Sequence, residues 1–306
     1  MPAFSTHYLF AEELMDRLAG LADFRLNRDA VYIGAQGPDI FFFHRALPWQ
    51  KGKSLRKAGS AMHRSKCGDI MDCFQEYCKS KAEPDIAKSY VYGFILHYAL
   101  DRICHPYIYF IQNRITDKFK TMNPHSVHNM IELSLDSVLL REKKNIRNPK
   151  AYKTEYMLHF TQRELSEISS VLASSGKLFS PYAFTDEDVA CAIKDTRAVQ
   201  RLLLDAAGSK EKFLKLAERL VSPFTGNFRI SSFLRTNDLE KAIKYVNMNN
   251  RKWRSPYSGE IRSESFTQLY ELAKDDAVEM IKRLDSGCTG EEITSNLSFL
   301  TGVRSE

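Results

Sequence analysis

The chain has 306 residues, a length that suits one large domain or two smaller ones, and it carries a formal net charge of +6. Apolar residues make up 43% and charged residues 27%, which is the balance of a globular protein with a sizeable core. No window approaches the roughly 18 apolar residues of a membrane span, so a transmembrane segment is excluded, and the charge favours anionic partners only weakly.

The N-terminal stretch and the cysteines predict where the protein works. The stretch PAFSTHYLFAEELMDRL lacks a basic segment and has Glu12 and Glu13 where a signal peptide needs an apolar run. The six cysteines form no C-x-x-C pair, which argues against a thiolate zinc cage and favours reduced thiols. We therefore expect a soluble, cytoplasmic protein.

Helical patterns dominate the chain from its beginning. Phe10, Leu14, Leu18 and Leu21 recur at helical spacing, and His7 lies on the same stripe. Helices are also expected over about 70–81 and 86–104. Period-2 alternation is short and rare, so the sequence predicts an all-α protein.

A further helix is expected after Asn123, which suits an N-cap because Pro124 follows it at the first helical position. Its basic end near 141–144 suits a helix C-terminus. Beyond about 148 the pattern predicts additional helices near 151–172, 185–207, 210–221, 236–248, 264–285 and 290–298. Seven of the eight histidines lie at or before position 128. We therefore divide the chain into a metal-binding helical core over 1–148 and a C-terminal helical region over 149–306, whose role the sequence does not indicate.

The segment 27–67 is the long irregular part of the pattern, and such loops in compact domains are usually functional or disordered. Its aromatic content argues against disorder. Between Asp39 and Asp69 there are no acidic residues, but there are seven basic ones: Arg45, Lys51, Lys53, Arg56, Lys57, Arg64 and Lys66. One interpretation is that the Phe41–Phe43 run is core and the charges belong to a solvated loop. The other is a basic, partly aromatic lip, with Trp49, that attracts phosphate-bearing substrate or an anionic lipid surface.

The stretch GFILHYALDRICHP places His97, Asp101 and His105 four residues apart in an otherwise apolar helix. Residues at this spacing lie about 40° apart around the axis, but His97 and His105 are separated by a rise of about 12 Å, too long for one ion to bind both. An aspartate between them can bridge neighbouring ions. Pro106 disfavours helical geometry at His105, so we expect the helix to end or kink there. The spacing suits a multi-metal cluster.

His128 and Glu132 repeat the i, i+4 spacing at which two side chains can chelate one ion. His7, Asp39 and His63 are placed to complete the coordination, and imidazole plus carboxylate ligation favours zinc or another divalent transition metal. Each motif alone is common by chance, and a single histidine on an apolar face is usually a core residue. It is the concentration of eight candidates in one part of the chain that makes a metal site a serious alternative.

These stretches resemble the zinc-dependent phospholipase C family, relatives of the S1/P1 nucleases. The resemblance is carried by STHYLFAEEL, GAQGPDIFFF, MHRS, GFILHYALDRICHPYI and HNMIE, in the family's order across 1–140. It implies a phospholipase C/P1 nuclease-like all-α fold with clustered zinc ions. The part after 150 is similar only to less-studied bacterial members, notably at NMNNRKWRSPYSGEIRSESFTQLYELA.

The resemblance also implies roles for single residues. The implied metal ligands are His7, Asp39, His63, His97, Asp101, His105, His128 and Glu132, with Asp101 bridging and Asp39 a ligand that also orients the attacking water. His125 matches no family ligand, and a capping or supporting role is expected for it. Secreted members use the amine of a processed N-terminus as a ligand, and no signal peptide is expected here, so we expect two or three zinc ions.

The activity implied is hydrolysis of a phosphodiester by metal-activated water. The substrate would be anionic, and a phospholipid, with peripheral membrane contact, is one candidate. A nuclease or nucleotidase acting on nucleic acid or nucleotides with the same ligands remains the rival enzyme. A non-catalytic metal-binding helical scaffold is the alternative outside the enzymes.

Overall fold

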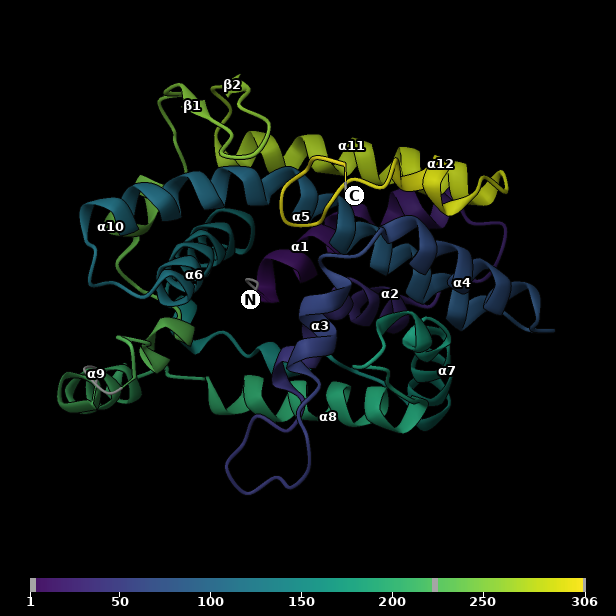
Figure 1. Cartoon of the computed structure of the whole chain (residues 1–306), viewed down its shortest axis with the longest axis horizontal. Coiled ribbons are helices and arrows are strands. Elements are labelled where there is room, and N and C mark those ends of the chain that lie inside the picture. The colour runs from purple at the N-terminus through teal and green to yellow at the C-terminus, as the bar shows by residue number, and fades with distance from the viewer. Residues whose placement is uncertain (1–3, 222–224, 305–306) are drawn as a thin grey trace. The chain divides into compact units, whose positions relative to one another are not determined.

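The computed structural model describes residues 4–221 and 225–304, and Figure 1 shows that it is built almost wholly of helices. The all-α prediction is confirmed. Secreted members of the similar family use the N-terminal amine as a metal ligand. In this chain that amine lies outside the described residues. No described helix combines the length and the apolar character needed to cross a bilayer.

The chain forms two compact units, each assembled from segments that are distant in the sequence. Unit 1 consists of Met1–Thr6, Cys104–Thr154 and Gln200–Leu269, and unit 2 of His7–Ile103, Glu155–Val199 and Tyr270–Glu306. The expected division at residue 148 falls inside unit 1 and stays a prediction.

Unit 2 is a helical body around an aromatic core. Phe10 packs edge-on against Tyr270 with ring centroids 5.1 Å apart, and Phe74 meets Phe94 at the same separation. All four rings are fully buried. Its elements are α1 (Phe4–Leu21, which begins in unit 1), α2 (Arg28–Gly34), the 3-10 helix η1 (Gly37–Phe43), α3 (Arg56–Met62), α4 (Cys67–Lys79), the first part of α5 (Asp85–Lys118), η3 (Thr154–Met157, which also begins in unit 1), α7 (Gln162–Ser174), η4 (Gly176–Phe179), most of α8 (Asp186–Leu202), most of α11 (Phe266–Asp285) and α12 (Gly290–Thr294).

Helices α2 and α5 cross at two glycines. A Cβ on Gly34 would lie 2.3 Å from the Tyr90 carbonyl oxygen, and one on Gly93 would lie 2.2 Å from that of Val31. Only glycine permits so close a backbone approach. The crossing fixes the start of η1 relative to α5, the two elements that carry Asp39, His97 and Asp101.

Unit 1 is organised around α6 (Pro124–Lys144), whose predicted cap is confirmed. The Asn123 side chain accepts hydrogen bonds from the backbone N–H groups of His125 and Ser126, at 3.1 and 3.2 Å. The other elements are the second part of α5, η2 (Pro149–Ala151), α9 (Ser209–Val221), η6 (Ile230–Phe233), α10 (Leu239–Ala242), η7 (Ile243–Tyr245), and the strands β1 (Trp253–Arg254) and β2 (Ile261–Arg262).

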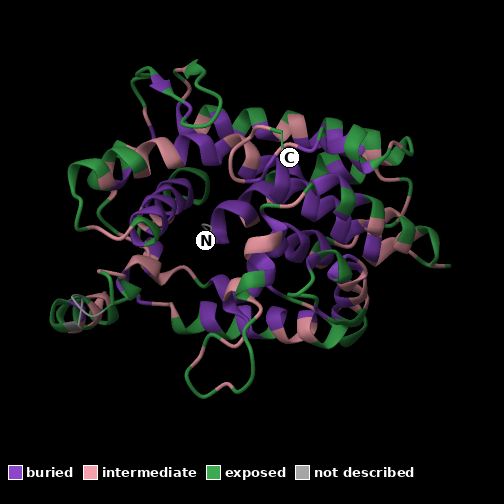
Figure 2. Cartoon of the chain, in the orientation of Figure 1, coloured by how far each residue is buried: buried purple, intermediate pink, exposed green. Residues whose placement is uncertain are grey.

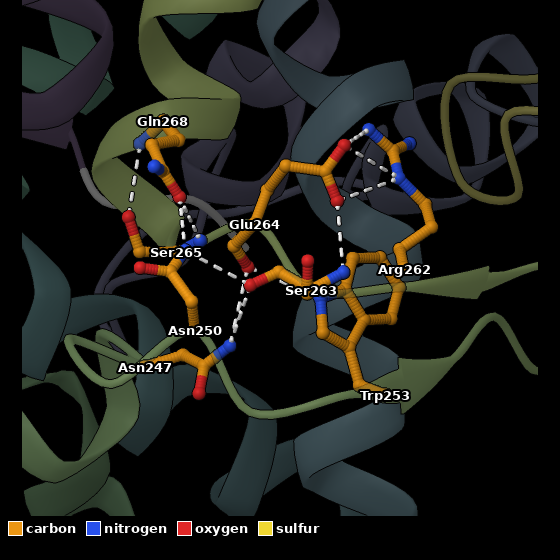
Figure 3. Close-up of polar contacts among 8 residues, drawn as sticks. All are labelled: Asn247, Asn250, Trp253, Arg262, Ser263, Glu264, Ser265 and Gln268. Atoms are coloured by element: carbon orange, nitrogen blue, oxygen red, sulfur yellow. Dashed lines mark hydrogen bonds and ion pairs between the residues drawn. The ribbon is translucent and has the colours of Figure 1, made fainter.

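The two strands form a small antiparallel hairpin that the helical pattern did not predict. Figure 3 shows the polar network at its base, where the Asn247 and Asn250 amides donate to the Ser263 carbonyl oxygen and the Trp253 indole N–H donates to that of Glu264. Both asparagines adopt positive φ, which this residue type tolerates. After η7, therefore, the chain is held by hydrogen bonds from side chains to the backbone, and the helix expected near 236–248 does not continue to its predicted end.

One expectation about local structure was wrong, and a second was wrong in part. The segment 27–67 is not wholly irregular, because α2, η1 and α3 lie within it. Helix α5 does not end at His105, since it continues through Pro106 to Lys118, and a kink at this point stays a prediction. A proline removes one backbone donor, and the burial of Tyr107 and Ile108 on the following turn favours continuing the helix.

Candidate metal centre

Five predicted ligands gather in unit 2 around two buried carboxylates. His7 Nε2 lies 3.2 Å from Asp101 Oδ1, and His97 Nε2 lies 3.2 Å from Asp101 Oδ2. His63 Nε2 lies 3.2 Å from Asp39 Oδ1 and 3.7 Å from Asp101 Oδ2. All five side chains are buried, with at most 5% of each residue exposed. We call these residues the unit 2 ligand group.

Backbone carbonyls orient two of these imidazoles. His63 Nδ1 lies 2.7 Å from the Gly59 carbonyl oxygen, and His97 Nδ1 lies 3.2 Å from that of Ala35. A carbonyl oxygen only accepts hydrogen bonds, so each Nδ1 carries the proton. The lone pair of each Nε2 then points at carboxylate oxygens, which is the orientation of a metal-binding histidine.

A glycine allows η1 to approach His97. Gly37 has a φ of +51°, and a Cβ there would lie 2.5 Å from the His97 ring. Glycine satisfies both the backbone conformation and the lack of space. On another side His97 contacts the fully buried Phe299, with ring centroids 6.1 Å apart. The imidazole is therefore held in one position.

The remaining three predicted ligands form a second group in unit 1. His128 Nε2 and His105 Nε2 lie 3.1 and 3.3 Å from the same oxygen of Glu132, Oε1. His128 Nδ1 lies 2.8 Å from the amide oxygen of Gln112, so it donates a hydrogen bond there. We call His105, His128 and Glu132 the unit 1 ligand group.

Burial and the close contacts within the unit 1 ligand group shift the pKa values of His128 and Glu132. Burial lowers the pKa of His128, which favours its uncharged form. Burial alone would raise the pKa of Glu132, but the adjacent His128 and His105 outweigh it and hold that pKa well below its usual range. Neutral imidazole and ionised carboxylate are the forms that bind a metal ion.

The family model described as zinc dependent phospholipase C matches residues 6–182, more than half of the chain. The chain belongs to this family. No curated protein and no solved structure gave a significant match. All eight predicted ligands lie inside the matched residues, and α9, the hairpin and α11 lie outside them.

The unit 2 ligand group fits the zinc that the family uses. His97 Nε2 and Asp39 Oδ2 are buried atoms that have no hydrogen-bond partner among the described residues. Because His97 and His63 hold their protons on Nδ1, their Nε2 lone pairs face carboxylate oxygens without a proton between them. Two acceptors in contact repel each other, and a divalent cation between them removes that conflict. The ligand atoms of His7, Asp39 and His97 lie within 4.8 Å of one another, as do those of His63, His97 and Asp101.

The unit 1 ligand group fits as well. Its three ligand atoms also lie within 4.8 Å of one another, and two imidazoles with one carboxylate are a familiar zinc donor set. That all eight ligands serve one cluster, with Asp101 bridging, stays a prediction.

The structure adds supporting residues that the spacing arguments missed. Gln112 orients His128, and the Tyr109 ring contacts both His128 and His105, with centroids 5.0 and 5.8 Å away. Gln112 lies about two turns beyond His105 on α5. Amide side chains are common on helices, so the sequence alone did not single it out. The His125 side chain is exposed, and its backbone N–H takes part in the α6 cap.

A third group in unit 2 consists of His44, Cys191 and Asp195. His44 Nδ1 accepts a hydrogen bond from the Leu55 backbone N–H at 3.0 Å, so the neutral ring carries its proton on Nε2. Burial lowers the pKa of this imidazole and favours that neutral state. A metal ion on Nε2 would require the loss of the Leu55 bond. His44 is therefore arranged to accept this backbone hydrogen bond rather than to bind a metal ion through Nε2.

The basic segment after Asp39 is part core and part solvated. Phe41 is fully buried and Phe43 nearly so, whereas 69% of Trp49 is exposed. The lysines at 51, 53 and 57 are also exposed. Phe41 and Phe43 thus belong to the core, as one of the two interpretations expected, whereas Phe42 is only partly buried and Trp49 remains at the surface.

Proposed function

We propose that the protein is a zinc-dependent phosphodiester hydrolase of the phospholipase C type. The observation that supports this most directly is the unit 2 ligand group, in which three imidazoles direct Nε2 atoms at two buried carboxylates. Family membership supports the same reaction class. A buried pair of carboxylates is costly unless a cation balances it, which gives these residues a reason to lie together.

Zinc bound there would supply Lewis acidity toward phosphate oxygens and acidify a water molecule. His7, His63 and His97 would hold the metal through Nε2, and Asp101 lies within reach of all three. Asp39 is assigned two roles, that of a ligand and that of the base that orients the attacking water. Its Oδ1 faces His63, and its Oδ2 is the buried oxygen that can accept a proton from water.

The substrate we propose is an anionic phosphodiester, with a phospholipid as the first candidate. Two or three zinc ions exceed the negative charge of Asp39, Asp101 and Glu132, so the loaded protein attracts a phosphate group. The expected cytoplasmic location is kept as part of the proposal.

The test combines metal analysis with a substrate panel. The purified protein, loaded with zinc, is assayed on a chromogenic phosphodiester, phosphatidylcholine, single-stranded DNA and nucleotides. We expect bound zinc and turnover of the diester and of phosphatidylcholine. Turnover of DNA or nucleotides alone would replace the phospholipase assignment with a nuclease or nucleotidase. Bound zinc with no hydrolysis of any substrate would indicate the metal-binding scaffold.

A further inference from the structure

Helix α9 (Ser209–Val221) in unit 1 turns an apolar stripe to solvent. Phe213, Leu216 and Leu220 are 70%, 62% and 75% exposed. They are spaced i, i+3 and i+7, so they lie on one side of the helix. Figure 2 shows α9 coloured mainly as exposed and intermediate. Single exposed leucines are ordinary, but three large side chains aligned on one helix call for an explanation.

The charges of α9 are divided between its two sides. Lys212 and Arg219 are exposed and follow the edge of the stripe at helical spacing. The acidic residues point away from the stripe. Glu211 pairs with Lys150 and Lys215, and the Glu218 carboxylate accepts bonds from the Ser231 backbone N–H and hydroxyl at 2.6 and 2.7 Å.

A small basic cavity adjoins this helix. It has a volume of about 240 Å³ and is lined by Lys215, Glu218, Arg219 and Arg229. Three cations surround one carboxylate, and that carboxylate is already bonded to Ser231. Lys215 and Glu218 lie on the side of α9 away from the apolar stripe, so the cavity adds positive charge to the helix without being part of its apolar side.

We propose that α9 is a docking surface for an anionic phospholipid membrane. An amphipathic helix with large apolar side chains on one side and lysine and arginine beside them lies in the plane of the bilayer interface, with the apolar side chains in the acyl boundary. Lys212 and Arg219, at the edge of the stripe, meet the acidic headgroups. A second copy of the chain fits less well, because pairing two such faces brings Lys212 and Arg219 against like charges. The inference rests on the proposed hydrolase function for its purpose, since docking would bring phospholipid to the enzyme.

The test is cosedimentation of the full chain with phosphatidylcholine vesicles that contain or lack phosphatidylserine. The apolar variant combines Phe213→Ser, Leu216→Ser and Leu220→Ser, and the charge variant combines Lys212→Gln and Arg219→Gln. Matched controls are Leu178→Ser with Leu272→Ser, two exposed leucines of unit 2, and Lys79→Gln with Lys282→Gln. A third variant combines Trp49→Ser, Lys51→Gln and Lys53→Gln, from the basic segment of unit 2. Circular dichroism checks that each variant is folded.

We expect the wild type to bind the phosphatidylserine vesicles, and the apolar variant to bind them about tenfold or more weakly. The charge variant should lose the preference for phosphatidylserine, and salt should weaken the wild type in the same way. Controls should bind like the wild type. Binding that survives in both α9 variants, or is lost only in the Trp49 variant, would overturn the proposal. So would a wild-type dimer that the apolar variant converts to a monomer in sedimentation velocity.

Turnover of a soluble chromogenic diester separates this inference from the proposed function. The α9 variants should hydrolyse it at the wild-type rate, because α9 supplies none of the predicted ligands. A wild type that binds vesicles but hydrolyses nothing would contradict the hydrolase and leave the docking surface standing. A wild type that hydrolyses the diester but binds no vesicles would contradict the docking surface and leave the hydrolase standing.

Discussion

In unit 2 five candidate ligands come from four separate segments, whereas in unit 1 three come from two helices. Asp39 and His63 of unit 2 lie on the 3-10 helix η1 and just after α3, and their positions depend on tertiary contacts such as the fit of Gly37 against His97. In unit 1 the His128–Glu132 pair is placed by helix geometry alone. The groups that orient the imidazoles also differ. In unit 2 backbone carbonyls orient His63 and His97, and in unit 1 the Gln112 side chain orients His128.

The difference teaches that two helices suffice to build a site with one carboxylate, whereas the two carboxylates of unit 2 are held by several elements. Asp39 and Asp101 are both buried and both contact His63. Holding them together without a cation would be unfavourable, so the surrounding fold must be stable enough to impose the arrangement. Unit 2 should therefore respond more strongly than unit 1 to the loss of one ligand.

The largest effect should come from Asp101→Asn. This carboxylate contacts His7, His63 and His97, so its loss should remove more than one equivalent of zinc and lower diester hydrolysis by at least about a hundredfold, the upper end of the cost of losing an outer-shell partner. Elemental analysis and steady-state kinetics measure both. The control is His159→Ala, an exposed histidine paired with Asp29. A loss of one equivalent only would show that Asp101 does not bridge.

Glu132→Gln should have the next largest effect on zinc content, and it tests whether the two ligand groups bind metal separately. Glu132 Oε1 lies against His105 and His128 of the unit 1 ligand group, so the variant should lose a single equivalent and retain the metal of unit 2. The measurement is zinc content against that of Asp101→Asn under the same dialysis. If both variants lost all their zinc, the two ligand groups would behave as one cooperative site.

Arg235→Met should destabilise unit 1 without touching a ligand. The Arg235 guanidinium donates to Asp136 at 2.6 Å and to the Ser5 hydroxyl at 2.8 Å, and Asp136 also accepts the Thr6 backbone N–H. Asp136 is fully buried, so removing its partner should cost about 3–5 kcal/mol of unfolding free energy.

Denaturant unfolding monitored by circular dichroism measures that cost. The control is Arg163→Met, since the Arg163–Glu83 pair is exposed and should contribute about 1 kcal/mol or less. Equal effects of the two substitutions would mean that the buried pair adds no more than a surface one.

Gln112→Leu tests whether the side-chain support in unit 1 matters. Without the amide oxygen, His128 loses the partner that fixes its tautomer, and zinc affinity of the unit 1 ligand group should fall about 10- to 100-fold. Competition with a chromogenic chelator measures the affinity. Asn113→Leu, at the neighbouring exposed position of α5, is the matched control. Affinity unchanged in Gln112→Leu would show that packing against Tyr109 suffices to orient the ring.

Much of this architecture follows from local pattern, and the rest depends on contacts between distant segments. The start of α6 could be predicted from Asn123 and Pro124, because capping is a local interaction. The continuation of α5 past Pro106 could not, because burial of Tyr107 outweighs a local preference. The hairpin was hidden for a similar reason, since its base is held by bonds between residues more than ten apart, such as the bond from the Trp253 indole to the Glu264 carbonyl oxygen.

The candidate site divides in the same way. The helical spacing of His97 with Asp101 and of His128 with Glu132 indicated pairs, and the distances of 3.2 and 3.1 Å agree with chelating geometry. Nothing in the spacing could show that Asp39 Oδ1 faces His63 or that Gln112 supports His128. The roles of all eight ligands rest on the family resemblance and stay predictions until metal binding is measured.

The smallest effect should come from Glu264→Gln in the hairpin that supports unit 1. The hairpin packs on α5, where Trp253 meets Tyr107 and Tyr257 meets Tyr109, with centroids 5.2 and 5.6 Å apart. Figure 3 shows the Arg262 guanidinium bonded to the Glu264 carboxylate, and this bond lowers the pKa of Glu264 from 4.5 to about 2.

A carboxylate whose pKa is lowered by folding stabilises the folded state at any pH above its ordinary pKa. For Glu264 that contribution is lost as the pH falls from about 4.5 to about 2. Because the pair is only partly buried and solvent screens it, the variant should lose about 1 kcal/mol or less at neutral pH. The difference in unfolding free energy between wild type and variant should then shrink toward zero across that window. Glu240→Gln, at an exposed position without this partner, is the control, and its difference from the wild type should stay flat. If the difference in unfolding free energy between wild type and Glu264→Gln were as large at pH 2 as at neutral pH, the stabilisation by Glu264 would not come from its bond to Arg262.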